Sequence, residues 1–388
     1  MSFTLCVIVD DYPSTGRPVF IFVEQLVNAF VDQGIPVSVV APQSLTRALF
    51  RRVPIMPKVE DYSTPSGNRY KVYRPYSISF GNHKLLLGKM INAYNQYNVN
   101  RVLKHISPDV LYGHFWHSAM KLLSYAKKYN RPLFVACGEG DDALENLVSR
   151  LTIDEKHDLT GAVKGVISVS SENKRKCLHY GLCKEQNIIV LPNGVDQNLF
   201  HPFDSSDIRK KLGLSEQDFT LVFTGAFIHR KGSSRLAEAI NLLHDKQIKV
   251  LFIGKPLAGD DATPECEGLL FRGTVDHKEL PKYLNAADVF VLPTLKEGCS
   301  NAIVEALACG LPVISSNKPF NDDILNEHNS LLVDPEDVSE LAAAIKAMKS
   351  NSLLFKSKKE YVLNNANNFS IIGRAQQILT FINNKIRS

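Results

Sequence analysis

The sequence contains no apolar run that approaches the ~20 residues needed to cross a bilayer. Its N-terminus, residues 1–10, lacks the basic segment and the long apolar stretch of a secretory signal. The seven cysteines are odd in number, scattered and never spaced as Cys-x-x-Cys, which disfavours both a disulfide framework and a zinc ribbon. We therefore expect a cytoplasmic protein with reduced thiols.

Common metal and nucleotide motifs are missing as well. The chain contains neither His-Glu-x-x-His nor Asp-x-Asp, so no metal site is predicted. Residues 225–232 lack the Gly-x-x-x-x-Gly-Lys-Ser/Thr spacing of a P-loop. The loop after the first expected strand has one glycine, Gly16, where a dinucleotide-binding loop has Gly-x-Gly-x-x-Gly. We therefore expect no nicotinamide, flavin or other cofactor.

The composition sets the size and class of the protein. At 388 residues, the chain is long enough for two domains. A hydrophobic fraction of 44% and a charged fraction of 22% exclude wholesale disorder, a collagen and a coiled-coil rod. The net charge of +5 is too small to indicate a nucleic-acid partner, but it suits an anionic small ligand or an anionic membrane surface.

Short β-branched runs alternate with longer segments of helical period, a pattern typical of parallel sheets with crossover helices. The expected strands are 5–9, 37–40, 71–74, 110–114, 133–137, 166–169, 188–191, 221–224, 250–253, 269–272, 289–292, 313–315 and 331–333. The turn-rich stretch 191–202 indicates an interdomain hinge. We predict an α/β protein of two doubly wound, Rossmann-like domains, residues 1–197 and 198–369, followed by a last helix over 371–385.

The richest loop follows the expected strand 289–292. Ser300 or Asn301 is expected to cap the helix that comes next. Because ligands of open parallel sheets bind beyond the carboxyl ends of the strands, the free N–H groups of that helix would form an anion site suited to phosphate. Glu297 and Glu305 would accept hydrogen bonds from hydroxyl groups, as a sugar nucleotide requires. Isolated carboxylates at this spacing are, however, more often solvated surface residues.

Two other strand ends carry candidate groups. Arg230 and Lys231 follow the first strand of the second half and can neutralise a diphosphate, although a basic turn by itself is more often solvated. His114 ends the strand 110–114, and His117 follows closely. A lone histidine at a strand end is usually structural, and a metal would need further ligands.

Four segments together carry a family resemblance. Glu297 and Glu305 match a Glu-x7-Glu signature, and the residues from Glu305 onward match the Glu-Ala-x-Ala-x-Gly-x-Pro-Val that follows it. The other matching segments are Pro192-Asn193-Gly194-Val195-Asp196 with Phe200 and Pro202, Lys231-Gly232, and Phe271-Arg272-Gly273-Thr274-Val275. Over nearly its whole length the chain resembles glycosyltransferase family 4, the retaining transferases of the GT-B fold. The resemblance implies two domains that face each other across a cleft, with the C-terminal helix, 370–388, returned to the first.

The resemblance also implies the reaction. A sugar would move, with retention and without a metal, from a nucleotide diphosphate sugar to a glycan or lipid-linked glycan in bacterial-type surface polysaccharide or glycolipid assembly. Glu305 would hold the ribose, Glu297 would contact the donor sugar, and Lys231 would support the diphosphate. The remaining implied contacts are His114 near the reacting sugar, Gly16 where the first loop approaches the donor, the backbone of Gly298, Cys299, Ser300 and Asn301 around the sugar and phosphates, and Thr274 and Val275 beside the base.

Two positions depart from the family pattern. Ala226 stands where the family usually has an arginine in the phosphate loop, and Arg230 is the nearest residue that can replace its charge. The stretch 137–142 replaces a His-Gly-Ser-Asp-like segment, which leaves the role of that stretch open. A catalytically degenerate protein that binds a nucleotide sugar or a glycan is therefore an alternative to the enzyme. A nucleotide-sugar epimerase of the same fold is disfavoured because it would lack the Glu-x7-Glu pairing.

Two basic segments bear on a membrane partner. Residues 45–52 place apolar and basic groups together, and 83–106 adds four Lys and Arg residues to a long helix with an apolar stripe. Such segments can lie peripherally on anionic lipid at the inner face of a membrane. A solvated basic face over an ordinary core stripe explains them equally well.

Overall fold

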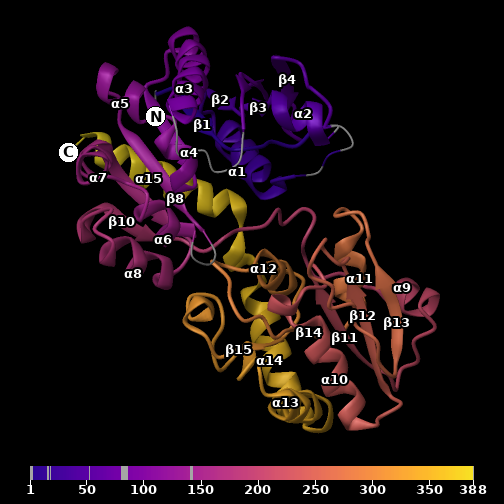
Figure 1. Cartoon of the computed structure of the whole chain (residues 1–388). Coiled ribbons are helices and arrows are strands. Elements are labelled where there is room, and N and C mark those ends of the chain that lie inside the picture. Colours follow the sequence, from indigo (N-terminus) through magenta and orange to yellow (C-terminus); the bar gives the residue numbers. More distant parts are fainter. Residues whose placement is uncertain are drawn as a thin grey trace. The chain divides into compact units, whose positions relative to one another are not determined.

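The computed structural model describes residues 3–14, 17, 19–51, 53–79, 86–139 and 143–387. The chain divides into two compact units (Figure 1). Unit 1 comprises Met1–Val169, Asn173–Leu191 and Ile371–Ser388, and unit 2 comprises Ser170–Glu172 and Pro192–Ser370.

Unit 1 is built on an eight-stranded sheet of order β10-β9-β8-β7-β1-β2-β5-β4. Its strands are β1 (Leu5–Ile8), β2 (Val37–Val40), β4 (Val59–Ser63), β5 (Arg69–Tyr73), β7 (Val110–His114), β8 (Leu133–Cys137), β9 (Val163–Ser168) and β10 (Ile188–Val190), beside a small pair of β3 (Gln43–Ser44) and β6 (Tyr76–Ser77). Its helices are α1 (Ile21–Asp32), α2 (Leu45–Arg51), α3 (Leu86–Ile106), α4 (Trp116–Met120), α5 (Leu123–Tyr129), α6 (Ala143–Val148), α7 (Ile153–Ala162), α8 (Ser171–His179), whose first two residues belong to unit 2, η1 (Glu185–Asn187) and α15 (Ile371–Arg387).

Alternate residues of β1 face opposite layers of unit 1. Leu5 and Val7 pack in a cluster with residues of α1 and α15, whereas Cys6 and Ile8 pack in a second cluster with residues of α3, α4 and α5. Both faces of the sheet are therefore covered, which explains why its central strands appear in the sequence as continuous apolar runs.

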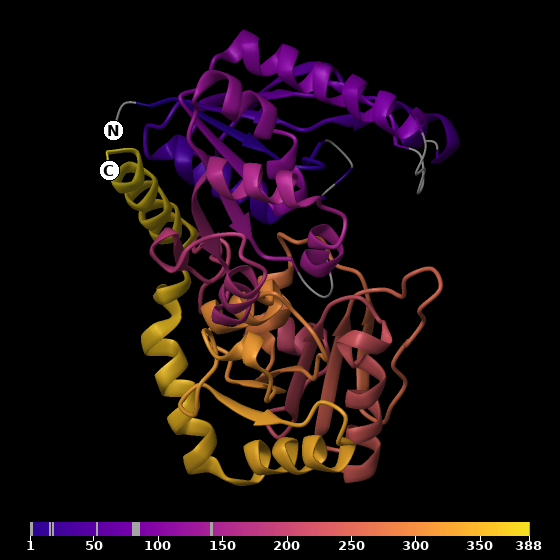
Figure 2. The same cartoon turned by 60° about the vertical axis from the view of Figure 1, so that its left-hand side comes forward.

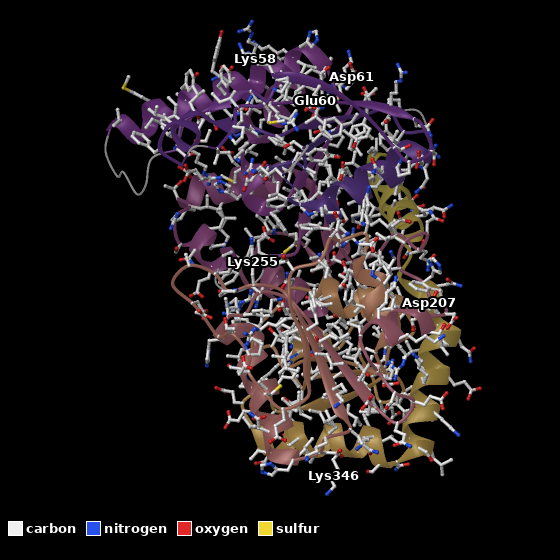
Figure 3. The ribbon with its side chains drawn as sticks, turned by 90° about the vertical axis from the view of Figure 1, so that its right-hand side faces the viewer. Lys58, Glu60, Asp61, Asp207, Lys255 and Lys346 are labelled. Atoms are coloured by element: carbon white, nitrogen blue, oxygen red, sulfur yellow. The ribbon has the colours of Figure 1, made fainter. Side chains whose placement is uncertain are left out.

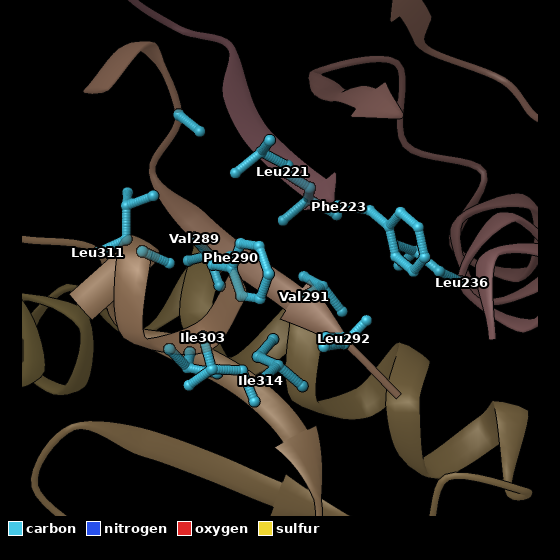
Figure 4. Close-up of a cluster of buried hydrophobic side chains, with 14 of the residues drawn as sticks. Leu221, Phe223, Leu236, Val289, Phe290, Val291, Leu292, Ile303, Leu311 and Ile314 are labelled. Atoms are coloured by element: carbon cyan, nitrogen blue, oxygen red, sulfur yellow. The ribbon is translucent and has the colours of Figure 1, made fainter. Parts of the chain in front are cut away.

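Unit 2 contains a six-stranded, entirely parallel sheet of order β13-β12-β11-β14-β15-β16. Its strands are β11 (Phe219–Thr224), β12 (Ile248–Ile253), β13 (Leu269–Gly273), β14 (Val289–Leu292), β15 (Val313–Ser316) and β16 (Ser330–Val333). Its helices are α9 (Ser206–Lys211), η2 (His229–Lys231), α10 (Ser233–Leu243), α11 (Leu280–Ala286), α12 (Asn301–Ala308), η3 (Pro319–Asn321), α13 (Val338–Ser350), α14 (Ser352–Asn365) and η4 (Ala366–Phe369). Side chains of β11, β14, β15, α10 and α12 fill its core (Figure 4).

The prediction of two doubly wound, Rossmann-like sheets is confirmed. The strand order of unit 2 is that of a Rossmann sheet, with the order reversing between β11 and β14, and in unit 1 it reverses between β1 and β7. The expectation of parallel strands is wrong at one edge of unit 1, because β4 pairs with β5 in antiparallel register. β4 was not predicted because the strand alternates exposed and half-buried residues and contains no apolar run.

The chain leaves unit 1 at Leu191 and not at the predicted residue 197. Pro192 follows directly, and the Val195 N–H donates to the Phe369 carbonyl at 2.8 Å, which ties the hinge segment to unit 2. Val195 and Phe200 belong to the core of unit 2. The predicted hinge is thus largely part of the second unit.

The last helix, α15, belongs to unit 1 (Figure 2). It packs against α1 and β9, and five of its residues, Ile371, Ala375, Ile378, Leu379 and Ile382, lie in the core of unit 1. Their helical spacing gives α15 one apolar face, which the sheet of unit 1 covers. In the part of the chain that the structure describes, no helix is long and apolar enough to span a membrane.

Candidate active site

The candidate site lies where the strand order of unit 2 reverses. β11 and β14 are neighbours in the sheet, and the loops that leave their carboxyl ends bring Lys231 and Glu297 together. In open α/β sheets, ligands bind beyond the carboxyl ends of the strands at this switch point. The topology therefore explains why two residues far apart in the sequence share one site.

One oxygen of Glu297 is shared by three partners. Lys231 Nζ donates to Glu297 Oε1, Arg230 Nη1 lies 3.3 Å from it, and Thr294 Oγ1 donates to it at 2.9 Å. The side chain of Glu297 is 11% exposed and that of Lys231 is 17% exposed. Because these side chains are partly shielded from water, the attraction between their opposite charges is stronger than between solvated loop residues.

Arg230 lies on the side of its loop that faces Glu297. Its Nη1 also donates to the Lys296 carbonyl at 2.5 Å. The guanidinium therefore belongs to the same cluster as Lys231, in the loop where Ala226 lacks a charge.

Hydrogen bonds to backbone carbonyls and a close glycine contact hold the loop after β11 against the loop after β14. The Leu295 N–H donates to the Arg230 carbonyl at 2.8 Å, and Arg235 Nη2 donates to the Pro293 carbonyl at 2.8 Å. Gly232 has φ +80°, and a Cβ on it would lie 2.4 Å from the Pro293 carbonyl oxygen. Only glycine permits both this backbone conformation and this close approach, so Gly232 fixes the position of the preceding Lys231.

Gly298, Cys299 and Ser300 lead into α12, which begins at Asn301. The predicted side-chain cap is wrong. Ser300 occupies the N-cap position without a capping hydrogen bond, and its Oγ is buried with no partner among the described residues. Asn301 Oδ1 instead accepts from Asn193 Nδ2 at 2.7 Å. The first backbone N–H groups of α12 have no acceptor one turn earlier in the helix, so they can bind an anion.

Glu305 lies in α12 and has a different partner from Glu297. Its Oε1 lies 3.0 Å from His277 Nε2, and its side chain is 13% exposed. Burial opposes protonation of His277, but the hydrogen bond and the negative charge of Glu305 outweigh it, so the pKa of His277 is raised. The His277 ring also lies 5.2 Å from that of Phe200.

Thr274 and Val275 follow β13, at the same edge of the sheet as the loops that carry Lys231 and Glu297. Thr274 is exposed, and Val275 packs partly against the core of unit 2. His277 comes two residues later and is a functional candidate that was not predicted from the sequence. The rule that loops after strands carry ligands would have included it, but its contact with Glu305 depends on the fold.

His114 lies in unit 1, at the carboxyl end of β7 next to β1. It is 7% exposed, and its Nδ1 has no hydrogen-bond partner among the described residues. Burial, together with the positive charge of Arg374, lowers its pKa to about 3. The rings of Phe22 and Phe115 lie 5.4 Å and 4.7 Å from it. His114 is therefore a neutral imidazole at physiological pH.

The predicted donor contact Gly16 lies outside the described residues.

Metal ligands do not gather in the described part of the chain: it contains no group of three or more His, Cys, Asp or Glu residues arranged to hold an ion.

Family comparisons cover most of the chain. Residues 19–199 match the family described as Glycosyltransferase Family 4, and residues 218–351 match that described as Glycosyl transferases group 1. TuaC of Bacillus subtilis (strain 168), whose name assigns it to teichuronic acid biosynthesis as a glycosyltransferase, is 25% identical over 86% of this chain and 86% of its own. The UDP-Gal:alpha-D-GlcNAc-diphosphoundecaprenol alpha-1,3-galactosyltransferase of Escherichia coli is 29% identical over 55% of this chain and 58% of its own.

Solved structures share the fold. Sucrose-phosphate synthase from Thermosynechococcus elongatus superposes with a TM-score of 0.76 at 20% identity, over 100% of both chains. Anabaena Alr3699/HepE, in complex with UDP and glucose, has a TM-score of 0.72 at 17% identity, over 99% of this chain and 100% of its own. The family matches agree with the two doubly wound sheets of this chain. The chain belongs to glycosyltransferase family 4, and the protein is a glycosyltransferase of the GT-B fold.

Proposed function

We propose that this protein transfers a sugar from a nucleotide diphosphate sugar to an acceptor hydroxyl, with retention at the anomeric carbon, in the assembly of a surface polysaccharide or glycolipid. The names of the relatives support a role in cell-surface glycan synthesis. The observation that carries the proposal is the cluster of Lys231, Arg230 and Glu297 at the switch point of unit 2.

The cluster suits a diphosphate next to a sugar. Lys231 has three N–H donors, so it can hold Glu297 and a phosphate oxygen together. Arg230 can bind phosphate oxygens through two parallel hydrogen bonds. Glu297, held by these cations, presents a carboxylate to hydroxyl groups of the donor sugar, while the backbone from Gly298 to Asn301 surrounds the phosphates.

These groups would act chiefly on the leaving group. As the bond to the sugar breaks, negative charge grows on the diphosphate, and Lys231, Arg230 and the N-terminus of α12 oppose it. Preorganised donors of this kind contribute ~3 to 4 kcal/mol each in other enzymes. The departing diphosphate would take the proton of the acceptor hydroxyl on the same face, which accounts for retention. No metal or other cofactor is assigned to this step.

The nucleoside end of the donor is assigned to other residues. We propose that Glu305 accepts hydrogen bonds from the ribose hydroxyls, that His277 orients Glu305 through their 3.0 Å contact, and that Thr274 and Val275 lie beside the base. His114, kept neutral by burial, would interact with the reacting sugar as a hydrogen-bonding group and not as a cation.

The partners follow from the reaction. We propose a glycan or lipid-linked glycan acceptor, no nucleic-acid partner, and work in the cytoplasm, peripherally on the inner face of a membrane when the acceptor is lipid-linked. A net charge of +5 is too small to indicate a nucleic acid but suits a small anionic donor.

A donor screen tests the proposal. UDP-, GDP- and ADP-sugars would be compared by thermal shift, and the release of nucleoside diphosphate would then be measured with the sugar that binds. We expect slow hydrolysis without acceptor, and an α-configured product from an α-configured donor. Glu297→Gln should lower this turnover at least about tenfold, which corresponds to 1.4 kcal/mol, while nucleoside diphosphate binding is not weakened.

Two results would reject the proposal. Binding of a nucleotide sugar with neither hydrolysis nor transfer to any acceptor would favour the catalytically degenerate binding protein. Inversion of a ring carbon in the free nucleotide sugar would indicate an epimerase.

A further inference from the structure

The positive charge of this protein is concentrated in one segment of unit 1. Residues 33–108 contain eleven Lys and Arg but only two acids, Glu60 and Asp61, a net charge of +9 in a chain whose total is +5. Figure 3 labels both acids beside Lys58. Glu60 is paired with buried Arg74 at 2.7 Å. The exposed part of this segment is therefore strongly cationic.

The helix α3 carries an exposed stripe within this segment. Its apolar members Leu87, Met90, Tyr94 and Tyr97 are 55%, 67%, 38% and 65% exposed, and the exposed cations Arg101 and Lys104 continue it. Successive members are three or four residues apart, so all six share one side of the helix. α3 contains no Asp or Glu. We call these six residues the outer stripe.

The helix α2 also exposes apolar and basic side chains. Leu49 is 74% exposed and Phe50 is 72% exposed, Arg47 is exposed, and α2 contains no acid. Its first turn is tied to the segment that follows β6, because Thr46 Oγ1 donates to the Ser79 carbonyl at 2.7 Å. The next link is Asn95 of α3, whose Oδ1 accepts from the Ile78 N–H at 2.8 Å. Both helices thus expose apolar and basic side chains, and residues 78 and 79 link the two helices.

The opposite side of α3 lines a cavity of about 550 Å³ that lies wholly in unit 1. Asn92, Gln96 and Val99 face it from α3, and Ala48 faces it from α2. At 100° per residue these α3 positions lie opposite the outer stripe. A helix with its side chains is about 10–12 Å across, so only this thickness separates the stripe from the cavity.

The wall of the cavity has a charged part and an apolar part. It lies at the carboxyl end of β1, next to the reversal of strand order in unit 1, and it includes the ion pair of Asp10 and Lys121. Apolar side chains such as Ile55, itself 53% exposed, line another part of the wall. An acceptor with a polar head and an apolar carrier matches both parts.

We propose that the outer stripe of α3 and the exposed end of α2 dock this protein on an anionic lipid bilayer, so that the cavity receives the head of a lipid-borne acceptor. The inference rests on the proposed function, because it names the acceptor class for that reaction. Leu49, Phe50, Leu87 and Met90 enter the boundary between headgroups and acyl chains, the tyrosines lie at headgroup level, and the cations pair with lipid phosphates.

The chemistry of the surface selects lipid over other partners. A coiled-coil partner would require apolar residues along the entire stripe, and the stripe ends in Arg101 and Lys104. A nucleic acid would pair with the cations but would leave Leu49, Phe50 and Met90 exposed to water. An anionic bilayer covers both kinds of side chain.

Vesicle sedimentation tests the inference. Vesicles of phosphatidylglycerol and phosphatidylcholine in roughly equal parts would be compared with pure phosphatidylcholine. We expect the full chain to bind the anionic vesicles and to lose binding as salt rises. Arg101→Gln/Lys104→Gln should weaken binding roughly fivefold for each cation removed. Leu49→Ser/Phe50→Ser/Met90→Ser should weaken it at least about tenfold, even at low salt.

Matched controls lie in unit 2. Leu242 and Leu353 are 53% and 80% exposed, and Lys346 and Lys356 are exposed as well; Lys346 is labelled in Figure 3. Leu242→Ser/Leu353→Ser and Lys346→Gln/Lys356→Gln should bind vesicles as the wild type does. Melting temperatures would show that every variant is folded.

Three outcomes would overturn the inference. The wild type could bind both vesicle types equally, or the α2 and α3 variants could bind anionic vesicles as well as the wild type does. The third outcome is a dimer of the wild type in solution that these variants dissociate. Nucleoside diphosphate binding, measured in parallel by thermal shift, should be the same in all variants. A failure of the proposed donor reaction would appear in that measurement and not in sedimentation.

Discussion

His277 Nε2 lies 3.0 Å from Glu305 Oε1, and this contact joins the loop after β13 to the helix after β14. The carboxylate raises the pKa of His277 against the opposing effect of burial. A histidine outside the family motif thus contacts one of the two glutamates of that motif.

The first prediction concerns this pair. Because the pKa of His277 is higher in the folded than in the unfolded protein, protonation stabilises the fold fully below the unfolded pKa of about 6.5. This contribution is lost as pH rises through the folded pKa. Urea unfolding should therefore show His277→Gln to be less stable than the wild type by about 0.5–1 kcal/mol at pH 5.5, with a smaller difference at pH 8.5. A difference independent of pH would contradict the ion pair.

The second prediction concerns Glu305. If its carboxylate accepts hydrogen bonds from the ribose, Glu305→Ala leaves those hydroxyls unpaired and should weaken nucleoside diphosphate binding by roughly 1 to 3 kcal/mol. Isothermal titration calorimetry would measure the change, with Glu340→Ala, on the first turn of α13, as the control carboxylate. Unchanged affinity in Glu305→Ala would remove Glu305 from the donor site.

The third prediction concerns the phosphate loop, in which Ala226 stands where the family usually has an arginine. Arg230 lies 3.3 Å from the same Glu297 oxygen that Lys231 contacts, so both cations should stabilise the leaving diphosphate. We expect steady-state turnover to fall in Arg230→Ala and in Lys231→Ala, by about tenfold for each 1.4 kcal/mol of lost transition-state stabilisation. Arg230→Lys separates charge from geometry, since it keeps the charge without the paired hydrogen bonds. Wild-type turnover in Arg230→Ala would leave Lys231 as the main catalytic cation of this loop.

The fourth prediction concerns His114. Its pKa is about 3 in the folded protein and about 6.5 when unfolded, so the unfolded state alone binds a proton between these values. The free energy of unfolding should therefore decrease as pH falls below about 6.5. In His114→Asn this decrease should be smaller, as measured by urea unfolding between pH 4.5 and 8. An equally steep decrease in His114→Asn would show that other groups cause the acid sensitivity.

Much of the fold could be predicted because local pattern determines it. Strands buried on both faces are apolar along their whole length, so β1, β8 and β14 are visible in the sequence as short apolar runs. The edge strand β4 has one exposed face and no such run, so only its pairing with β5 defines it. The helix α15 was visible by its period, but its place on α1 and β9 depends on long-range packing.

For the site too, some features follow from the sequence and others only from the tertiary structure. The sequence by itself determined the family, the two glutamates and the basic loop, because a motif is a matter of spacing along the chain. Which groups touch was decided only by the tertiary structure. Lys231 contacts Glu297 because β11 and β14 are neighbours in the sheet. His277 contacts Glu305 because β13 ends, and α12 begins, at the same edge of the sheet. The exposure of the α3 stripe was likewise undetermined, since a helical period shows that residues share a face but not whether the fold covers it.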